Sequence, residues 1–348
     1  MTGKLSRRRV NLLLATAATG IAAPAIIAHA GEKVSFAMGA GAFYFTLHYV
    51  AEAGGYYAAE GITLDSVNVS SGPRQTAAVM GGSADVAPLG LQLVVQAAQH
   101  AGNIVAVSAG YNILPMSILL SNDAIKRNGI TPDQSTDDKV KRLKGLRIGI
   151  TTPGSGTDDM VRAVMRKRGM DPDRDVTIQP LVNAEGMMAA LERGATDGFC
   201  FTSPIPELAV SRKLGQIVLE PLNGDVPEAN NVPYIILSTN RETIANKRPM
   251  LLAMVRCWTK AMDLVRDQPG EASKLVHRYF PDVDEEVYDA AFKKYRQGVP
   301  TTPMVTAEQT ENVVSFMKIS KGIPVTANYA DVFYPGIAEE VAKTRGKA

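Results

Sequence analysis

The sequence predicts an α/β protein made of two similar lobes joined by two connecting strands. Three observations lead to this prediction. Short apolar segments alternate with helix-like segments over the first two thirds of the chain, an order typical of parallel sheets covered by helices. Two such sets of segments have the same internal order, and the second set lies inside the first. After residue 238 the pattern is almost purely helical.

The first lobe begins with alternating strands and helices. Strands are expected at 33–39, 62–69, 86–88 and 104–109, and helices at 44–53, 73–81 and 89–100. Pro73 suits an early helical position, because the N–H that proline lacks has no partner in the first turn of a helix. Turns with small residues precede the first two of these helices, so the carboxyl ends of the strands lead into helix N-termini.

The second lobe repeats this order. Strands are expected at 146–150, 176–181 and 198–201, with helices after Ser155 and at 184–193. Ser155, with Asp158 three residues later, resembles a capping box at the start of a helix. The glycine-rich turn before this helix leaves backbone N–H groups and the positive end of the helix dipole free to hold an anion.

A short motif recurs in both lobes. Residues 82–85 and 194–197 each begin with Gly and end with Asp, between a helix and a strand. Apolar strands at 114–121 and 232–238 flank the second set of elements. We therefore expect lobe 1 to contain residues 31–113 and 237–348, lobe 2 to contain residues 122–231, and the hinge segments to be residues 114–121 and 232–236. The helical C-terminal part is expected to pack on lobe 1.

The N-terminus has the pattern of an export signal. Three consecutive arginines, Arg7 to Arg9, precede an apolar run rich in Ala and Leu, and Ala28-His29-Ala30 is a small-x-small cleavage pattern. Paired arginines are typical of a twin-arginine signal, while an ordinary secretory signal with a basic start remains the alternative. We expect residues 1–30 to be removed near Ala30 and the protein to be periplasmic.

Charge and cysteine content exclude several functions. Without the four basic residues of the first thirty, the chain has 33 Lys and Arg against 35 Asp and Glu, so no basic face is left for nucleic acid. Cys200 and Cys257 each lie within an apolar element, which favours two buried thiols over a disulfide. No spacing of His, Cys or carboxylates suggests a metal, and no complete nucleotide-binding loop is present.

Four segments of the chain carry a resemblance to a known family. They are residues 51–62, 82–86, 143–149 and 194–198. Together they resemble the periplasmic solute-binding proteins of ABC importers, in particular the nitrate/sulfonate/taurine and thiamine-precursor (NMT1-like) group, over most of residues 32–270. The resemblance implies a type II periplasmic binding protein without a cofactor. Such a protein acts as a monomer, closes on a small solute and presents it to a membrane permease and its ATPase subunits.

The resemblance also implies where the solute binds, at the loops that follow the strands. Among the residues outside those loops, Arg74 is either a counter-charge for an acidic ligand or a solvated surface residue. Phe43, Tyr44 and Tyr111 could pack against an apolar part of the ligand. The candidate ligand-binding residues are Phe43, Tyr44, Ser71, Gly72, Arg74, Gly90, Tyr111, Thr152, Ser155, Gly156, Thr157, Thr202 and Ser203.

We expect a protein without catalytic residues that binds a small organic anion of the sulfonate, nitrate or carboxylate class. One alternative ligand is a thiamine-pyrimidine type precursor. The alternative class is an enzyme on the same fold, either a pyrimidine synthase or a sulfinate hydrolase with a catalytic cysteine. The cysteine-rich iron motif of the synthase is missing, and Cys200 lies mid-strand with no base nearby in sequence.

Overall fold

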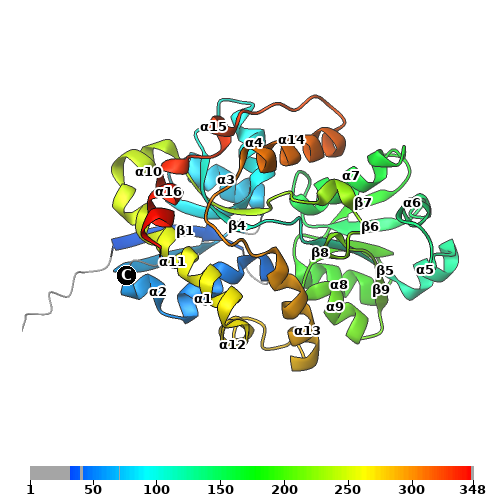
Figure 1. Ribbon diagram of the computed structural model, residues 1–348. Helices are drawn as coiled ribbons and strands as arrows, with labels where there is room; N and C mark the ends of the chain where they lie inside the picture. Colours follow the sequence, from blue (N-terminus) through cyan, green and yellow to red (C-terminus); the bar gives the residue numbers. More distant parts are fainter. Residues whose placement is uncertain (1–31, 40–41, 70, 346–348) are drawn as a thin grey trace, which may run out of the picture.

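The computed structural model describes residues 32–39, 42–69 and 71–345. These residues form two five-stranded mixed sheets, each covered by helices (Figure 1). We call sheet A with its helices lobe 1 and sheet B with its helices lobe 2. The expected signal peptide, residues 1–30, lies outside the described residues. Within the described ranges, no helix combines the length and the apolar character needed to cross a bilayer.

Sheet A has the strand order β2-β1-β3-β10-β4, with β10 antiparallel to both of its neighbours. Its strands are Glu32–Met38 (β1), Ile62–Asn68 (β2), Val86–Gly90 (β3), Val105–Tyr111 (β4) and Ile235–Thr239 (β10). The helical elements between them are Phe43–Phe45 (η1), Thr46–Ala53 (α1), Tyr56–Ala59 (α2), Gly72–Met80 (α3) and Leu91–Ala98 (α4). Every residue of β3, β4 and β10 is buried, as expected for strands covered on both faces.

Sheet B repeats the arrangement with the order β7-β6-β8-β5-β9, in which β5 is the antiparallel strand. Its strands are Met116–Ser121 (β5), Arg147–Ile150 (β6), Thr177–Pro180 (β7), Gly198–Thr202 (β8) and Gly215–Leu219 (β9). The accompanying helices are Asn122–Asn128 (α5), Thr136–Lys141 (α6), Gly156–Lys167 (α7), Ala184–Glu192 (α8) and Ile205–Ser211 (α9). The two sheets thus have the same topology, which explains why the two halves of the chain share a sequence pattern.

The repeated aspartates make the same contact in each lobe. Oδ2 of Asp85 accepts a hydrogen bond from the N–H of Ser35 at 3.0 Å, and Oδ2 of Asp197 accepts one from the N–H of Arg147 at 2.8 Å. Each aspartate N–H donates in return to the carbonyl oxygen of that same residue. The motif therefore joins the residue before one strand to the neighbouring strand, at Ser35 in the middle of β1 and at Arg147, the first residue of β6.

The two predicted hinge strands lie inside the sheets, which corrects the expected boundaries. β5 pairs with β8 and β9 in sheet B, and β10 pairs with β3 and β4 in sheet A. The chain crosses between the lobes at residues 112–115 and 220–234, where Pro221–Asn223 (η2) and Pro227–Ala229 (η3) are short helical turns. An apolar run predicts a strand but does not show which sheet will hold it.

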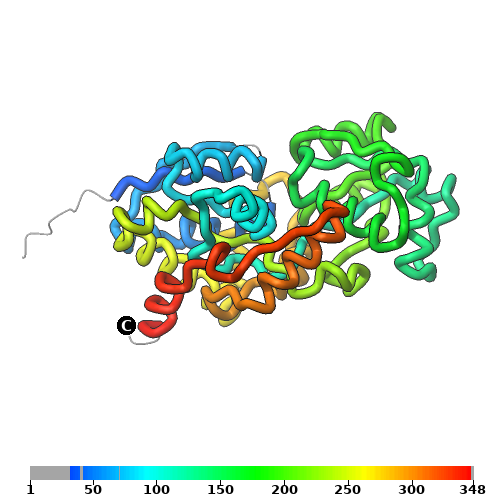
Figure 2. The backbone as a smooth tube through the Cα atoms, turned by 90° about the horizontal axis from the view of Figure 1, so that it is seen from above, coloured from blue at the N-terminus to red at the C-terminus, as the bar shows by residue number. Residues whose placement is uncertain are grey.

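The C-terminal part is helical, as expected, but it packs on both lobes. It contains Arg241–Asn246 (α10), Arg248–Asp267 (α11), Pro269–His277 (α12), Glu285–Tyr295 (α13), Arg296–Gly298 (η4), Ala307–Lys321 (α14), Tyr329–Val332 (α15) and Pro335–Thr344 (α16). α11 packs on α1 and α16 of lobe 1, whereas α14 packs mainly on α7 of lobe 2 and also on α4 of lobe 1. In Figure 2 the later part of this segment, orange to red, lies across both lobes.

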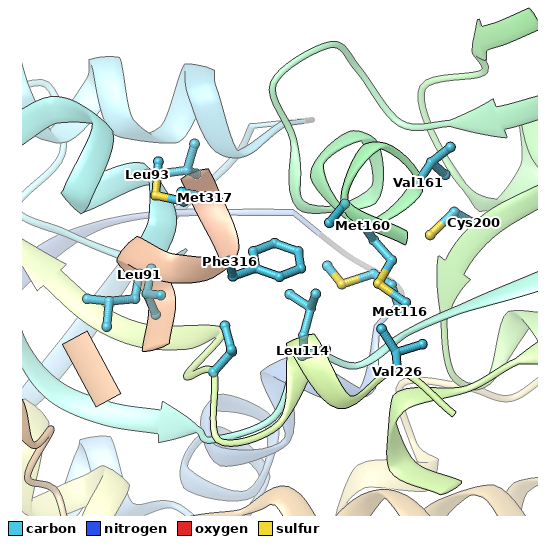
Figure 3. Close-up of a cluster of buried hydrophobic side chains, with 14 of the residues drawn as sticks. Leu91, Leu93, Leu114, Met116, Met160, Val161, Cys200, Val226, Phe316 and Met317 are labelled. Atoms are coloured by element: carbon cyan, nitrogen blue, oxygen red, sulfur yellow. The ribbon is translucent and has the colours of Figure 1, made fainter. Parts of the chain in front are cut away.

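α14 also joins the hydrophobic cores of the lobes. Phe316 of α14 lies between Leu91 of α4 and Met160 of α7, and Met317 of α14 lies on the α4 side (Figure 3). All four side chains belong to one apolar cluster that runs from sheet A to sheet B. Separating the lobes along this cluster would expose apolar surface to water, so we expect the lobes to stay joined on the α14 side.

Candidate ligand-binding cleft

A cavity of about 280 Å³ lies between the lobes. It is bounded by the carboxyl ends of β1, β2 and β3 in lobe 1 and of β6, β7 and β8 in lobe 2, the usual position of ligands in open α/β sheets. The lobe 1 side is lined by Gly39, Tyr44, Phe45, Asn68, Val69, Ser71, Gly72, Gln75, Pro88, Gly90, Leu93 and Ile235. The lobe 2 side is lined by Met116, Thr151, Ser155, Gly156, Thr157, Val182, Asn183, Ala184, Glu185, Phe201 and Thr202, and Tyr234, directly before β10, completes the lining.

Many of the residues predicted from the sequence meet in this cavity. Eight of the thirteen line it, four from lobe 1 and four from lobe 2: Tyr44, Ser71, Gly72, Gly90, Ser155, Gly156, Thr157 and Thr202. Sequence analysis could place them at strand ends, and the two lobes bring these strand ends to face each other. The strand-end rule therefore predicted the position of the cavity better than the identity of the aromatic residues in it.

Two of the predicted aromatic residues belong to the core instead. The ring of Phe43 packs edge-to-face on Phe280, with ring centroids 4.9 Å apart. Tyr111 stacks on Tyr295 at 4.1 Å, and its hydroxyl donates to the Tyr295 carbonyl oxygen at 2.7 Å. Both side chains are almost completely buried and neither lines the cavity. The C-terminal helix α13 covers these strand ends, which local sequence patterns could not reveal.

Three more predicted residues lie outside the cavity lining. Arg74 is exposed on α3, so the structure does not support its role as a counter-charge. The buried hydroxyl of Ser203 donates to Oε1 of Glu207 at 2.7 Å. Thr152 lies in the turn before α7, and its buried hydroxyl has no partner among the described residues. Ser203 and Thr152 therefore lie in loops that contribute other residues to the cavity, but neither of them lines it.

Three hydroxyl groups form a network at the N-terminus of α7. The Thr151 hydroxyl donates to Oγ of Ser155 at 2.8 Å, and the hydroxyls of Ser155 and Thr157 are 2.9 Å apart. The N–H of Thr151 donates to Oγ1 of Thr157 at 2.9 Å. Ser155 is the N-cap, as predicted, and accepts from the N–H of Asp158. Together with the first N–H groups of the helix, this network can donate hydrogen bonds to an acidic group without supplying a positive side chain.

Two buried carboxylates lie directly behind this network in the first turn of α7. Asp158 accepts from the N–H of Gly154 at 2.8 Å and from Nε of Arg162 at 2.7 Å. Asp159 pairs with Nζ of Lys321 from α14 at 2.7 Å and is only 1% exposed. Burial raises the pKa of Asp159, and Lys321 offsets part of this effect. Each carboxylate thus pairs with a cation, although Arg162 also pairs with Asp173, so this turn adds no unpaired positive charge to the helix N-terminus.

Tyr44 and Tyr234 form an aromatic wall beside the α7 N-terminus. Their rings meet edge-to-face, with centroids 5.4 Å apart. Burial raises the pKa of both phenols, which keeps them neutral. A Cβ atom at Gly156 would lie 2.6 Å from the Tyr234 ring, so only glycine permits this close packing. Tyr234 was missed by sequence analysis, although its place in a segment that crosses between the lobes is a signal that could have indicated it.

Thr202, at the end of β8, carries a buried hydroxyl in the cavity wall. The residue is 1% exposed, and its Oγ1 has no hydrogen-bond partner among the described residues. Buried polar groups are nearly always paired, so this unpaired hydroxyl is a candidate to form a hydrogen bond with a bound molecule. Thr202 belongs to β8 and not to α7, so this observation is independent of the helix N-terminus.

The cavity lining contains very little charge. Among its described residues Glu185, in the first turn of α8, is the only charged side chain, and no Lys, Arg or His is present. Glu185 is exposed, at the mouth of the cavity, and was not among the predicted residues. Across the described part of the chain, no group of three His, Cys, Asp or Glu residues is arranged to hold a metal ion.

Both cysteines are buried free thiols, as predicted. Cys200 lies on β8 beside Val161 of α7, within the apolar cluster (Figure 3). Burial raises the pKa of the Cys200 thiol, which disfavours the reactive thiolate. Neither cysteine lines the cavity.

Comparison with known proteins identifies relatives along most of the chain. The sequence model of the NMT1-like family matches residues 29–279. YtlA of Bacillus subtilis (strain 168) is 21% identical over 310 residues, which cover 87% of this chain and 87% of YtlA.

Solved structures share the fold at low sequence identity. A protein from Bordetella bronchiseptica RB50 has a TM-score of 0.77 at 20% identity and covers 90% of this chain and 97% of its own. The alkanesulfonate-binding protein SsuA from Xanthomonas axonopodis pv. citri, bound to MOPS, has a TM-score of 0.68 at 15% identity. The match covers 88% of this chain and 99% of the SsuA chain. The desulfurization enzyme DszB has a TM-score of 0.59 at 14% identity, and the match covers 89% of this chain and 99% of the DszB chain. This chain therefore has the periplasmic binding protein fold, which binding proteins and at least one enzyme share.

Proposed function

Because this chain belongs to the NMT1-like family, we propose that it is the solute-binding component of an ABC importer and that it captures a small organic anion between its lobes. The anion is of the sulfonate, nitrate or carboxylate class. The single observation that carries this proposal is the cavity at the strand ends of both lobes, where the hydroxyl network of α7 faces Ser71 and Gln75 across the cleft. The sulfonate-binding neighbour supports the ligand class.

The acidic head of the solute binds at the α7 N-terminus. It accepts hydrogen bonds from the first N–H groups of α7 and from the hydroxyls of Ser155 and Thr157, which can turn from each other to the ligand. Thr202 gains a partner for its unpaired hydroxyl. The rings of Tyr44 and Tyr234 pack on the body of the ligand, as aromatic side chains do in typical small-molecule pockets.

The protein works outside the cytoplasm and delivers its solute to a membrane permease with ATPase subunits. The N-terminal arginines and the cleavage pattern at Ala30 support export of a protein that lacks residues 1–30, and we expect this protein to act as a monomer. Replacing Arg7 and Arg8 by lysine blocks export if the twin-arginine route is used. Normal export of that variant leaves the general secretory route, and an unprocessed cytoplasmic protein contradicts both routes.

Calorimetric titration of the purified protein with methanesulfonate, nitrate and acetate tests the binding function. Saturable binding of one of these anions, with the anion recovered unchanged, supports the proposal. Native mass spectrometry of the protein as purified would identify a solute carried over from the cell. Binding of neutral solutes only, or turnover of the added compound, would contradict the proposal.

A thiamine-pyrimidine type ligand is the second candidate. The observation that favours it is a cavity with aromatic side chains and no basic residue among its described lining. A flat neutral ring could pack on Tyr44 and Tyr234 and exchange hydrogen bonds with Asn68 or Glu185. Titration with the pyrimidine, alongside the anions, separates the two ligand classes because only one class should saturate the cleft.

An enzyme on this fold is the alternative class, since DszB shares it. A sulfinate hydrolase would need a cysteine thiolate facing the substrate. Cys200 is instead packed in the core behind the cavity, where burial raises its pKa. The Cys200→Ser variant is therefore expected to bind anions like the parent protein, whereas loss of a measurable turnover in this variant would favour the enzyme.

A further inference from the structure

The charge around the cleft limits the kind of head group that it can hold. Among the described lining residues no side chain is cationic, and the single charged one is the acid Glu185. The donors at the α7 N-terminus are backbone N–H groups and the hydroxyls of Ser155 and Thr157. All of these donors are neutral, so they stabilise an anion by direction and number of hydrogen bonds rather than by full charge.

The region behind these donors adds no positive charge. Asp158 and Asp159 occupy the first turn of α7, where their negative charges oppose the positive end of the helix dipole. Arg162 and Lys321 each form an ion pair with one of these carboxylates. Because Arg162 and Lys321 are paired in this way, neither of them adds an unpaired positive charge behind the head-group position.

We propose that the cleft selects a head group carrying one negative charge and rejects dianions, and that Glu185 is the residue at its mouth that strengthens this selection. This inference rests on the proposed binding of an organic anion. The unpaired, buried hydroxyl of Thr202 supports a ligand in the cavity independently of the helix N-terminus.

Desolvation supplies the physical reason for the selection. The cost of moving an ion out of water rises with the square of its charge, so a dianion costs about four times as much as a monoanion of the same size. The same set of neutral donors offsets only part of the additional cost, because none of the described lining side chains is cationic. The carboxylate of Glu185 repels a second negative charge and does so more strongly at low ionic strength.

Two pairs of ligands of matched shape test the selection. Methanesulfonate and benzenesulfonate keep one negative charge at all working pH values, while methyl phosphate and phenyl phosphate change from monoanion to dianion near pH 6. Titration at about pH 5 and about pH 7.5 is expected to show equal sulfonate affinity, while phosphate-ester affinity falls at least tenfold at the higher pH. Comparable affinity for the phosphate dianion and the sulfonate would overturn the inference.

Binding of the sulfonates distinguishes a failure of the charge selection from a failure of the proposed anion-binding function. If the sulfonates bind and the dianions bind equally well, anion capture stands and the selection is wrong. If neither the sulfonates nor the phosphate monoanions bind at either pH, the proposed anion binding is wrong and this inference falls with it.

The role of Glu185 is tested by Glu185→Gln, with Glu192→Gln as the matched control. Both acids are exposed residues of α8, but Glu192 lies at the other end of the helix, pairs with Arg212 and does not line the cavity. Glu185→Gln is expected to tighten dianion binding roughly twofold to fivefold at low salt, and sulfonate binding by less. Glu192→Gln is expected to change neither affinity. Equal effects of the two substitutions, or no gain for the dianion, would remove Glu185 from the selection.

Discussion

The backbone N–H of Phe43 donates a hydrogen bond to the carbonyl oxygen of Ser203, with 3.1 Å between nitrogen and oxygen. Phe43 belongs to η1 of lobe 1, and Ser203 directly follows β8 of lobe 2. The two lobes thus contact each other through main-chain atoms close to the cavity. Any opening that separates these two segments must break this bond, so the contact is characteristic of a closed arrangement.

We expect the free protein to populate a more open state that a bound anion closes. Only a ligand with a higher affinity for the closed state can shift this equilibrium. Small-angle X-ray scattering should therefore give a smaller radius of gyration in the presence of saturating sulfonate. Identical scattering curves with and without the sulfonate would show that the protein is rigid or closed before binding.

Ser155→Ala should weaken anion binding roughly tenfold or more. Loss of one hydrogen bond to a charged group typically costs about 1.5–3 kcal/mol. Because Ser155 is also the N-cap of α7, the variant should lose stability as well, by about 1 kcal/mol. The control is Ser135→Ala, which removes the N-cap of α6 away from the cavity. The control should lose similar stability and bind normally, and weakened binding in both variants would contradict a direct contact.

Arg74→Ala should leave anion affinity within about twofold of the parent value. The side chain is exposed and outside the cavity lining, so solvent screens the effect of its charge on a ligand in the cavity. Calorimetry with methanesulfonate and with a neutral solute compares the two ligand types. A large loss confined to the anion would restore the counter-charge role that the sequence suggested.

Asp197→Asn should destabilise the protein, with an effect that disappears in acid. Burial alone would raise the pKa of Asp197, but hydrogen bonds from Arg147 and Arg127 lower it well below its usual value. The stabilisation is therefore present above the unfolded-state pKa of about 3.9 and is lost as the pH falls through the lower folded-state pKa. Urea unfolding at neutral pH should show a loss of about 1.5–3 kcal/mol.

The control for this substitution is Asp65→Asn. Asp65 forms an ion pair with Lys33 in which both side chains are at least half exposed. Exposed pairs contribute about 1 kcal/mol at most, so this variant should change little at any pH. An equal loss in both variants would show that the buried contact with Arg147 is not the cause.

Lys321→Met should destabilise the contact between α14 and α7 by about 3 kcal/mol, the lower end of the range for buried pairs, because Lys321 is 20% exposed. Asp159 would remain buried without its cation, and its raised pKa would rise further. A group with a raised folded-state pKa loses stability as the pH rises through that pKa. The difference in stability between the variant and the parent should therefore be largest at neutral pH and small near pH 4.

Lys318→Met serves as the control for this helix. Lys318 is an exposed residue of α14, one turn before Lys321. Urea unfolding should show little change in Lys318→Met at either pH. If Lys321→Met loses the same stability at both pH values, lost packing rather than the charge of Asp159 explains its effect.

The sequence by itself determined the local structure of this protein and its family. Helical spacing and capping residues predicted α7 with its N-cap at Ser155, and the Gly-to-Asp motifs predicted two halves of the same construction. Strand ends predicted the edges where Ser71, Thr157 and Thr202 meet. These features depend on residues close together in the chain, whose backbone geometry and hydrogen bonds follow from their own side chains.

Only the tertiary structure decided which elements complete each sheet and what enters the cleft. β5 and β10 are both predicted as apolar strands, but β5 pairs within sheet B and β10 pairs within sheet A. Phe43 lies in the core because Tyr288 and Tyr295 of α13 pack on its ring. Tyr234 and Glu185 line the cavity because segments distant in the chain meet there. The position of α14 across both lobes depends on burying Phe316 and Met317. These arrangements depend on the burial of apolar surface between segments that are far apart in the chain. A local sequence pattern carries no information about which distant segments will meet.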